Sequence, residues 1–242
     1  MDSNDEETVD TVPLVFRLGS RLVTAKRADL LDPRRTIYRL ELNQSPFLPL
    51  VQSSIMFLCP LVKSLLPEWF LPATVILKTQ KDGWEDEFQT EKRAYDILKP
   101  IQGTTIPHFF GETVYNGSPT LVLSVIDGTT LFDLARGFSE DEYDALRQSL
   151  EIALRAITSY GVDYTDEKLD NFLALDDWGI MIVDLEQVVF DTTKAWEESN
   201  NCARVDRLMQ EFMGGRKPRQ PSFRDCCCPV STQDRLPGTP ST

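Results

Sequence analysis

The chain has almost no histidine and no disulfide framework. Its single histidine among 242 residues is His108, which excludes a Ser-His-Asp triad and any His/Cys set with the spacing of a metal site. We expect His108 to be structural. Of the five cysteines, Cys59 and Cys202 are isolated, and Cys226-Cys227-Cys228 are adjacent. This usage predicts a reducing, cytoplasmic setting.

The chain also has no net positive charge and no signal-peptide pattern at its start. The net charge of -13 and the pI near 4.6 predict that the chain does not bind nucleic acid, because such binding depends on lysine and arginine meeting phosphates. Residues 1–11 are acidic, lack the basic-then-apolar layout of a signal peptide and are expected to be disordered. Residues 214–242 are rich in Gly, Pro, Ser and Arg and predict a flexible tail.

No apolar run of about 20 residues is uninterrupted, as a membrane-spanning helix requires. The most apolar stretch, Pro46–Pro72, is broken by Pro49, Pro60 and Pro67, so we expect an insertion that packs on neighbouring strands. An interfacial contact with a membrane or a partner is the alternative. A lipidated, basic anchor at Cys226–Cys228 is likewise the alternative to an unmodified tail.

The chain does contain a hairpin signal flanked by metal-binding residue types. Asp176–Gly179 is a polar turn between two apolar runs. An antiparallel hairpin brings Asn171 and Asp184 to the same open end, with Asp166 and Lys168 on the loop that leads into it. An amide oxygen and a carboxylate suit Mg²⁺, while a second carboxylate can accept a proton and a lysine can meet a phosphate. A polar loop before an ordinary hairpin is the plainer interpretation.

A second candidate pair lies upstream. Thr74–Lys78 is a β-branched strand that ends in a lysine. The following segment predicts a helix with Glu91 on the same face as an apolar stripe, formed by Trp84, Phe88, Tyr95 and Leu98. A carboxylate on such a face is costly unless a cation meets it, so Lys78 is the expected partner. The alternative is that Glu91 reaches solvent beside the stripe.

The remaining elements are a buried strand and two helices. Leu121–Ile126 predicts the strand. Ser139 and Glu142 have the spacing of a capping box, after which a helix that Gly161 ends has its buried stripe at Leu146, Leu150, Ala153, Leu154 and Ile157. A final helix is expected at about 193–213, with apolar positions at Trp196, Val205, Leu208, Met209 and Phe212.

These residues, in this order, resemble the catalytic core of the protein kinase-like superfamily, and in particular small fungal protein-kinase-like proteins with a shortened C-terminal lobe. The resemblance covers about residues 36–190. It implies an α+β fold of two lobes: a β-rich N-lobe with one helix over residues 12–126, which carries the insertion at 46–72, and a truncated helical C-lobe over residues 127–213.

The family's catalytic-loop pattern has an Asp, an Asn five positions later and a metal-binding Asp after the next hairpin. Carried over, Asp166 would orient or deprotonate the acceptor hydroxyl, and Lys168 would neutralise the transferred phosphoryl group. Asn171 and Asp184 would hold Mg²⁺.

The resemblance also implies a nucleotide site. Lys78, paired with Glu91, would bind the phosphates of ATP, and Asp127–Thr130 would form the connection beside the adenine. The implied function is an ATP- and Mg²⁺-dependent phosphotransferase that acts on a hydroxyl of a protein or a small molecule.

The chain departs from the family at four points. The family's glycine-rich phosphate lid has no counterpart beyond Leu18-Gly19-Ser20. Asp-Phe-Gly becomes Asp184-Leu185-Glu186, Tyr164-Thr165 replaces the His-Arg before the catalytic aspartate, and no Ala-Pro-Glu follows. The missing glycine-rich lid and Asp184-Leu185-Glu186 support one alternative, a pseudokinase that binds partners with little or no turnover. The other alternative, a membrane-tethered scaffold, would use Pro46–Pro72 and the cysteine tail.

Overall fold

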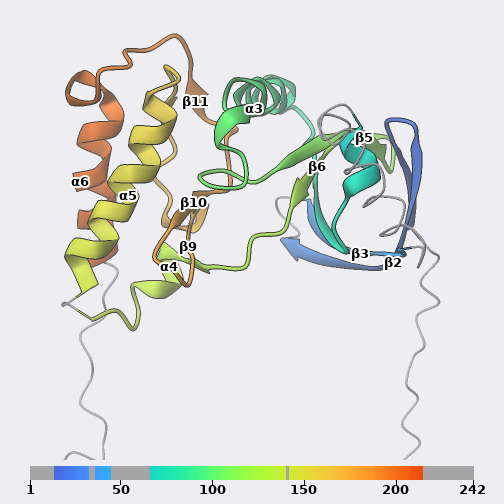
Figure 1. Cartoon of the computed structure of the whole chain (residues 1–242), viewed down its shortest axis with the longest axis horizontal. Helices are drawn as coiled ribbons and strands as arrows, with labels where there is room; N and C mark the ends of the chain where they lie inside the picture. The colour runs from blue at the N-terminus through green and yellow to red at the C-terminus, as the bar shows by residue number, and fades with distance from the viewer. Residues whose placement is uncertain (1–13, 33–35, 45–65, 140–141, 215–242) are drawn as a thin grey trace, which may run out of the picture.

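The structure is a computed structural model, which describes residues 14–32, 36–44, 66–139 and 142–214. It is an α+β protein with a six-stranded sheet at one end and two long helices at the other (Figure 1). We call residues 14–124 the sheet part and residues 127–214 the helical part. Residues 1–11, most of the stretch 46–72, and the tail with Cys226–Cys228 lie outside the described residues, so the expectations for them stay predictions.

The sheet is antiparallel throughout, with strand order β1-β2-β3-β4-β6-β5. The bounds are β1 Leu14–Leu18, β2 Arg21–Asp32, β3 Ile37–Leu42, β4 Thr74–Thr79, β5 Phe109–Tyr115 and β6 Ser118–Ser124. The two expected strands at Thr74–Lys78 and Leu121–Ile126 are therefore confirmed as β4 and β6, with small shifts of their ends. Buried and exposed side chains alternate along β1. The face of the sheet that carries Phe16 and Leu18 covers an apolar core.

The β1–β2 turn rests on the described end of the apolar insertion. Gly19 has φ 54°, and a Cβ there would lie 2.7 Å from Glu68 Oε1, so the turn requires glycine. The same carboxylate accepts hydrogen bonds from Ser20 N and Ser20 Oγ, at 3.3 and 3.0 Å. The described residues 66–72 thus pack on the sheet, as expected. Gly19 belongs to a structural turn at the sheet's edge.

Helix α3, Glu85–Ile97, crosses between the sheet and the rest of the molecule (Figure 1). The predicted stripe is confirmed at Phe88, Glu91 and Tyr95, all buried. Trp84 is different: it precedes the helix, is 37% exposed, and its ring lies under the Lys81 ammonium. Glu91 is therefore fully buried, and its carboxylate does not reach solvent.

The helical part is built on α5, Tyr143–Thr158, and α6, Asn200–Gly214. The expected stripe of α5 is fully buried, whereas the expected capping box is wrong. The helix begins at Tyr143, and Glu142 makes no side-chain cap; only its backbone N–H bonds to Ser139 O. The last helix also begins later than expected, because Trp196 lies in a separate 3₁₀ turn, Trp196–Glu198.

Short strands lie between these helices and the sheet. They are β7 Thr129–Thr130, β8 Asp163–Tyr164, β9 Phe172–Ala174, β10 Ile180–Ile182 and β11 Val188–Val189, with the short helix α4, Leu131–Leu134, after β7. One continuous core joins α3, the inner residues of β6 and the buried faces of α5 and α6. Among the described residues, no helix has the length and apolar character needed to cross a membrane.

Helix α5 offers a matched pair of substitutions that tests this core. Leu154 is fully buried, whereas Ile152 on the same helix is 61% exposed. Leu154→Ala should lower the free energy of unfolding by about 2–5 kcal/mol, because a cavity remains in the core. Ile152→Ala should change it by about 0.5 kcal/mol or less. Urea denaturation of both variants measures the difference, and equal effects would show that this face of α5 is not the buried one.

Candidate functional site

The centre of the candidate site is an ion pair between β4 and α3. Lys78 Nζ lies 2.9 Å from Glu91 Oε1 and 2.7 Å from Glu91 Oε2. The two side chains are 5% and 1% exposed. The Lys78–Glu91 pair expected from the sequence is thus present. A charged group on a buried helical face needs an opposite charge, and Lys78 supplies it for Glu91.

Two further carboxylates from the segment after β10 meet the same ammonium. Lys78 Nζ lies 2.9 Å from Asp184 Oδ1 and 3.1 Å from Glu186 Oε1. Glu186 also contacts Lys81 Nζ at 2.8 Å. One oxygen each of Glu91, Asp184 and Glu186 lies within 4.8 Å of the others. Three acids therefore share two lysines at the junction of the sheet part and the helical part.

Burial and charge shift the proton affinities of this cluster. Burial alone would lower the pKa of Lys78, but the carboxylates of Glu91, Asp184 and Glu186 together raise it above its usual value. Burial raises the pKa of Glu91 to about 7, against the opposing pull of Lys78. Because the cluster has more acids than nearby cations, the most buried carboxyl is the one whose pKa is raised toward neutrality.

The expected hairpin is confirmed as strands β9 and β10. Phe172 pairs with Ile182, and Val183 N donates to Asn171 O at 3.0 Å. Asn171 and Asp184 consequently sit just beyond the paired ends, at the same open end of the hairpin. Asp184 turns its carboxylate to Lys78.

A second polar cluster surrounds Asp166, on the loop between β8 and β9. Asp166 Oδ2 accepts from Lys168 Nζ at 2.8 Å and from Asn171 Nδ2 at 3.0 Å. The side chain of Asp166 is 11% exposed and that of Lys168 is 57% exposed, while Asn171 is fully buried. The structure thus brings together Asp166, Lys168 and Asn171, as the spacing implied.

Helix α6 holds the loop that carries Asp166. Asn201, fully buried, accepts from Tyr164 N at 2.9 Å and donates to Val162 O at 2.9 Å. Arg204 Nε lies 3.3 Å from Glu167 Oε1. Helix α6 therefore anchors the backbone just before Thr165 and the side chain of Glu167 after it, which supports the position of Asp166 between them.

A cavity of about 210 Å³ opens beside Lys78. In the register, Ile37 faces Lys78 and Arg39 faces Ile76, so these four side chains lie on one face of the sheet and line the cavity. The other walls are Leu31, Pro107, Leu123, Ser124, Val125, Ile126, Leu173 and Val183. The cavity is smaller than the roughly 300–1,000 Å³ of drug-sized sites, and its apolar walls suit a single flat ring system.

Sequence reasoning missed three contributors to the site: Glu186, Lys81 and Asn201. Lys81 and Glu186 are 105 positions apart, and no local pattern pairs them. The position of Glu186, two residues after Asp184, was a usable signal, because alternate residues of an extended segment point to the same side. Asn201 had a signal too, as a polar residue among the apolar positions of α6.

The oxygens that the structure places close enough together for one cation are those of Glu91, Asp184 and Glu186. Asp184 and Asn171 offer a carboxylate and an amide oxygen, the hard ligands that Mg²⁺ prefers. Neither a protein-family model nor a curated protein sequence matches the chain.

The raised pKa of Glu91 gives the stability of the protein a testable pH dependence. The folded protein holds this proton up to about pH 7, whereas the unfolded chain releases it near pH 4.5, so the contribution of Glu91 to stability falls as pH rises through this window. Relative to Glu91→Gln, which cannot titrate, the wild type should lose about 1–3 kcal/mol between pH 4.5 and 7.5.

Urea denaturation of both proteins at several pH values measures this difference. Glu112→Gln, which removes a partly exposed carboxylate paired with Lys92, is the control and should show no such trend. A wild type that gains stability over Glu91→Gln as pH rises would show that Glu91 is ionised throughout.

Proposed function

We propose that the chain is an ATP- and Mg²⁺-dependent phosphotransferase of the protein kinase-like superfamily, with a two-lobed fold in which the helical part is a truncated C-lobe. The observation that carries the proposal is the position of Lys78. Its ammonium contacts both the α3 carboxylate Glu91 and the hairpin carboxylate Asp184, beside an apolar cavity.

In this function the apolar cavity takes the adenine ring, and the connection after β6 lies at its edge. Lys78 binds phosphate oxygens, and Glu91 holds the lysine in place. Asn171 and Asp184 hold Mg²⁺, which would supply charge neutralisation for the phosphates. Positioning and electrostatics account for most of the rate in phosphoryl transfer.

The chemistry at the acceptor falls to Asp166 and Lys168. Asp166 is held by Asn171 and is close to solvent, so it is positioned to take the proton of an incoming hydroxyl. Lys168 neutralises the phosphoryl group in transit. A cavity of about 660 Å³ reaches from Lys168 to Lys81 and Trp84 in the sheet part. Its size and polar lining favour a small-molecule acceptor over a protein.

One contact favours the alternative, a pseudokinase that binds partners with little or no turnover. Glu186 stands where the family has glycine, and its carboxylate competes with phosphates for Lys78. A lysine that already has three carboxylate partners gains less free energy when it binds the phosphates of a nucleotide. Turnover and binding must therefore be measured separately.

Nucleotide binding is tested by thermal unfolding with Mg²⁺ and ATP. A ligand at one hundred times its dissociation constant stabilises the folded state by about 2.7 kcal/mol, so the wild type should show a clear rise in Tm that depends on Mg²⁺. Asp184→Ala should abolish the metal-dependent part. Asp176→Ala, at the exposed turn of the same hairpin, should retain it. An equal Mg²⁺-dependent rise in Tm in both variants would show that Asp184 does not bind the metal.

Turnover is tested with labelled ATP and a panel of proteins, sugars and other small hydroxyl compounds. Asp166→Ala should lower phosphoryl transfer by about 10²-fold or more, while the Mg²⁺-ATP thermal shift stays. A wild type that binds Mg²⁺-ATP yet transfers no phosphate to any acceptor or to water would favour the pseudokinase.

A further inference from the structure

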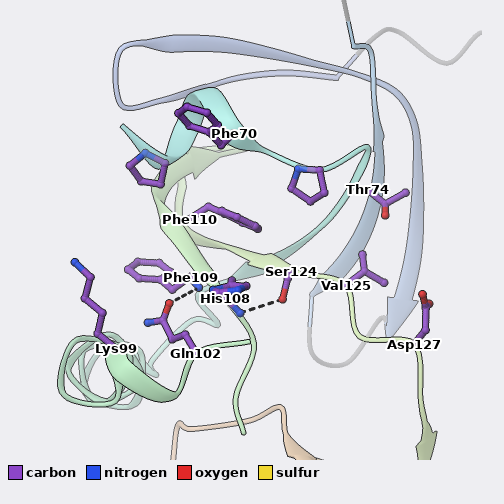
Figure 2. A pocket seen from close by; sticks show the side chains of 12 residues that line it. Phe70, Thr74, Lys99, Gln102, His108, Phe109, Phe110, Ser124, Val125 and Asp127 are labelled. Carbon is purple, nitrogen blue, oxygen red and sulfur yellow. Dashed lines mark hydrogen bonds between the residues drawn. The ribbon is translucent and has the colours of Figure 1, made fainter. Parts of the chain in front are cut away.

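A third cavity, of about 570 Å³, lies on the sheet part at the start of the connection between the two parts of the molecule. Figure 2 shows its walls, where the rings of Phe70, Phe109 and Phe110 gather on one side of Ser124. Pro67 and Pro72 complete this apolar lining. The volume falls within the roughly 300–1,000 Å³ of sites that bind small organic molecules.

Two of the polar side chains that line the cavity, Ser124 and Gln102, already have partners in the protein. Ser124 Oγ accepts from His108 N at 3.0 Å. Gln102 Oε1 accepts from Phe109 N at 3.0 Å, and Gln102 Nε2 donates to Tyr95 O at 2.9 Å. An apolar ring can therefore enter the cavity without breaking the hydrogen bonds of Ser124 and Gln102.

Two exposed charges stand at opposite ends of the cavity. In Figure 2, Lys99 lies beyond Phe109, and Asp127 lies on the far side, past Val125. Within the part of the chain that the structure describes, neither forms an ion pair. The aromatic rings gather toward Lys99. An anionic aromatic ligand that stacks on them therefore has its charged end near the Lys99 ammonium and away from the Asp127 carboxylate.

We propose that this cavity is a binding site for a small aromatic carboxylate. Its ring lies among Phe70, Phe109 and Phe110, where aromatic contacts add to the burial of apolar surface, and its carboxylate meets Lys99. The proposal does not depend on phosphoryl transfer, since none of the residues that would carry that reaction lines this cavity.

Two walls of this cavity adjoin the candidate site. Ser124 and Val125 line both this cavity and the 210 Å³ cavity beside Lys78, so the connection is a shared wall. On the other side, Phe109 stacks on Tyr95 with ring centroids 5.4 Å apart, and Tyr95 lies one turn after Glu91 on α3. A ligand in the 570 Å³ cavity can therefore shift the walls of the 210 Å³ cavity beside Lys78.

Binding is tested on the full chain with three probes of one shape: 1-naphthoate, neutral 1-naphthalenemethanol and cationic 1-naphthylmethylamine. Isothermal titration should rank naphthoate as the tightest. Amide NMR signals of Phe109, Ser124 and Val125 should shift during the naphthoate titration, while those of α6 stay in place. Equal affinity for the three probes, or shifts confined to other surfaces, overturns the proposal.

Variants locate the carboxylate and the ring. Lys99→Gln should weaken naphthoate binding about two- to fivefold, the range that an exposed ion pair supports, and should leave the neutral probe unchanged. Phe70→Ala should weaken all three probes. Lys194→Gln and Phe132→Ala, which alter exposed residues outside the cavity, are the matched controls. Naphthoate affinity that no cavity variant changes, or no binding at millimolar concentrations, overturns the site.

Discussion

A buried ammonium group joins the two parts of the molecule. Lys78 extends from β4 to Glu91 on α3 and to Asp184 and Glu186 after the β9–β10 hairpin. Taking such a charge out of water costs several kcal/mol unless opposite charges surround it, so the sheet, the helix and the hairpin must meet at this one point. The apolar core shared by α3, β6 and α5 then packs around a junction whose position the charges dictate.

The same junction determines what the site can do. A lysine buried among carboxylates stays charged, and the neighbouring acid with the least solvent, Glu91, has its pKa raised. In the proposed reaction, phosphate oxygens and Glu186 compete for that ammonium. In that reaction residue 186 would therefore affect nucleotide affinity, whereas the Asp166 cluster, which α6 supports through Asn201, would act on the acceptor hydroxyl. Binding and turnover are separable for this physical reason.

Local patterns predicted more of the fold than of the site. The hairpin, β4 and the buried face of α3 follow from periodicity and turn residues, and the Lys78–Glu91 pair follows because one carboxylate lay on an apolar face. The contacts of Glu186 and Asn201 join segments far apart in sequence, so no local signal pairs them. Ser139 and Glu142 had capping-box spacing, yet the helix begins at Tyr143, because that spacing alone does not fix where the buried face of α5 starts.

The most direct test is a double-mutant cycle between Lys78 and Asp184, with Lys78→Met and Asp184→Asn measured singly and together by urea denaturation. If one ammonium joins the sheet part to the hairpin, the two changes are strongly coupled, with an interaction energy of about 1–3 kcal/mol. Effects that add within about 0.3–0.5 kcal/mol would mean that the two side chains do not meet, and the account of the junction would be contradicted.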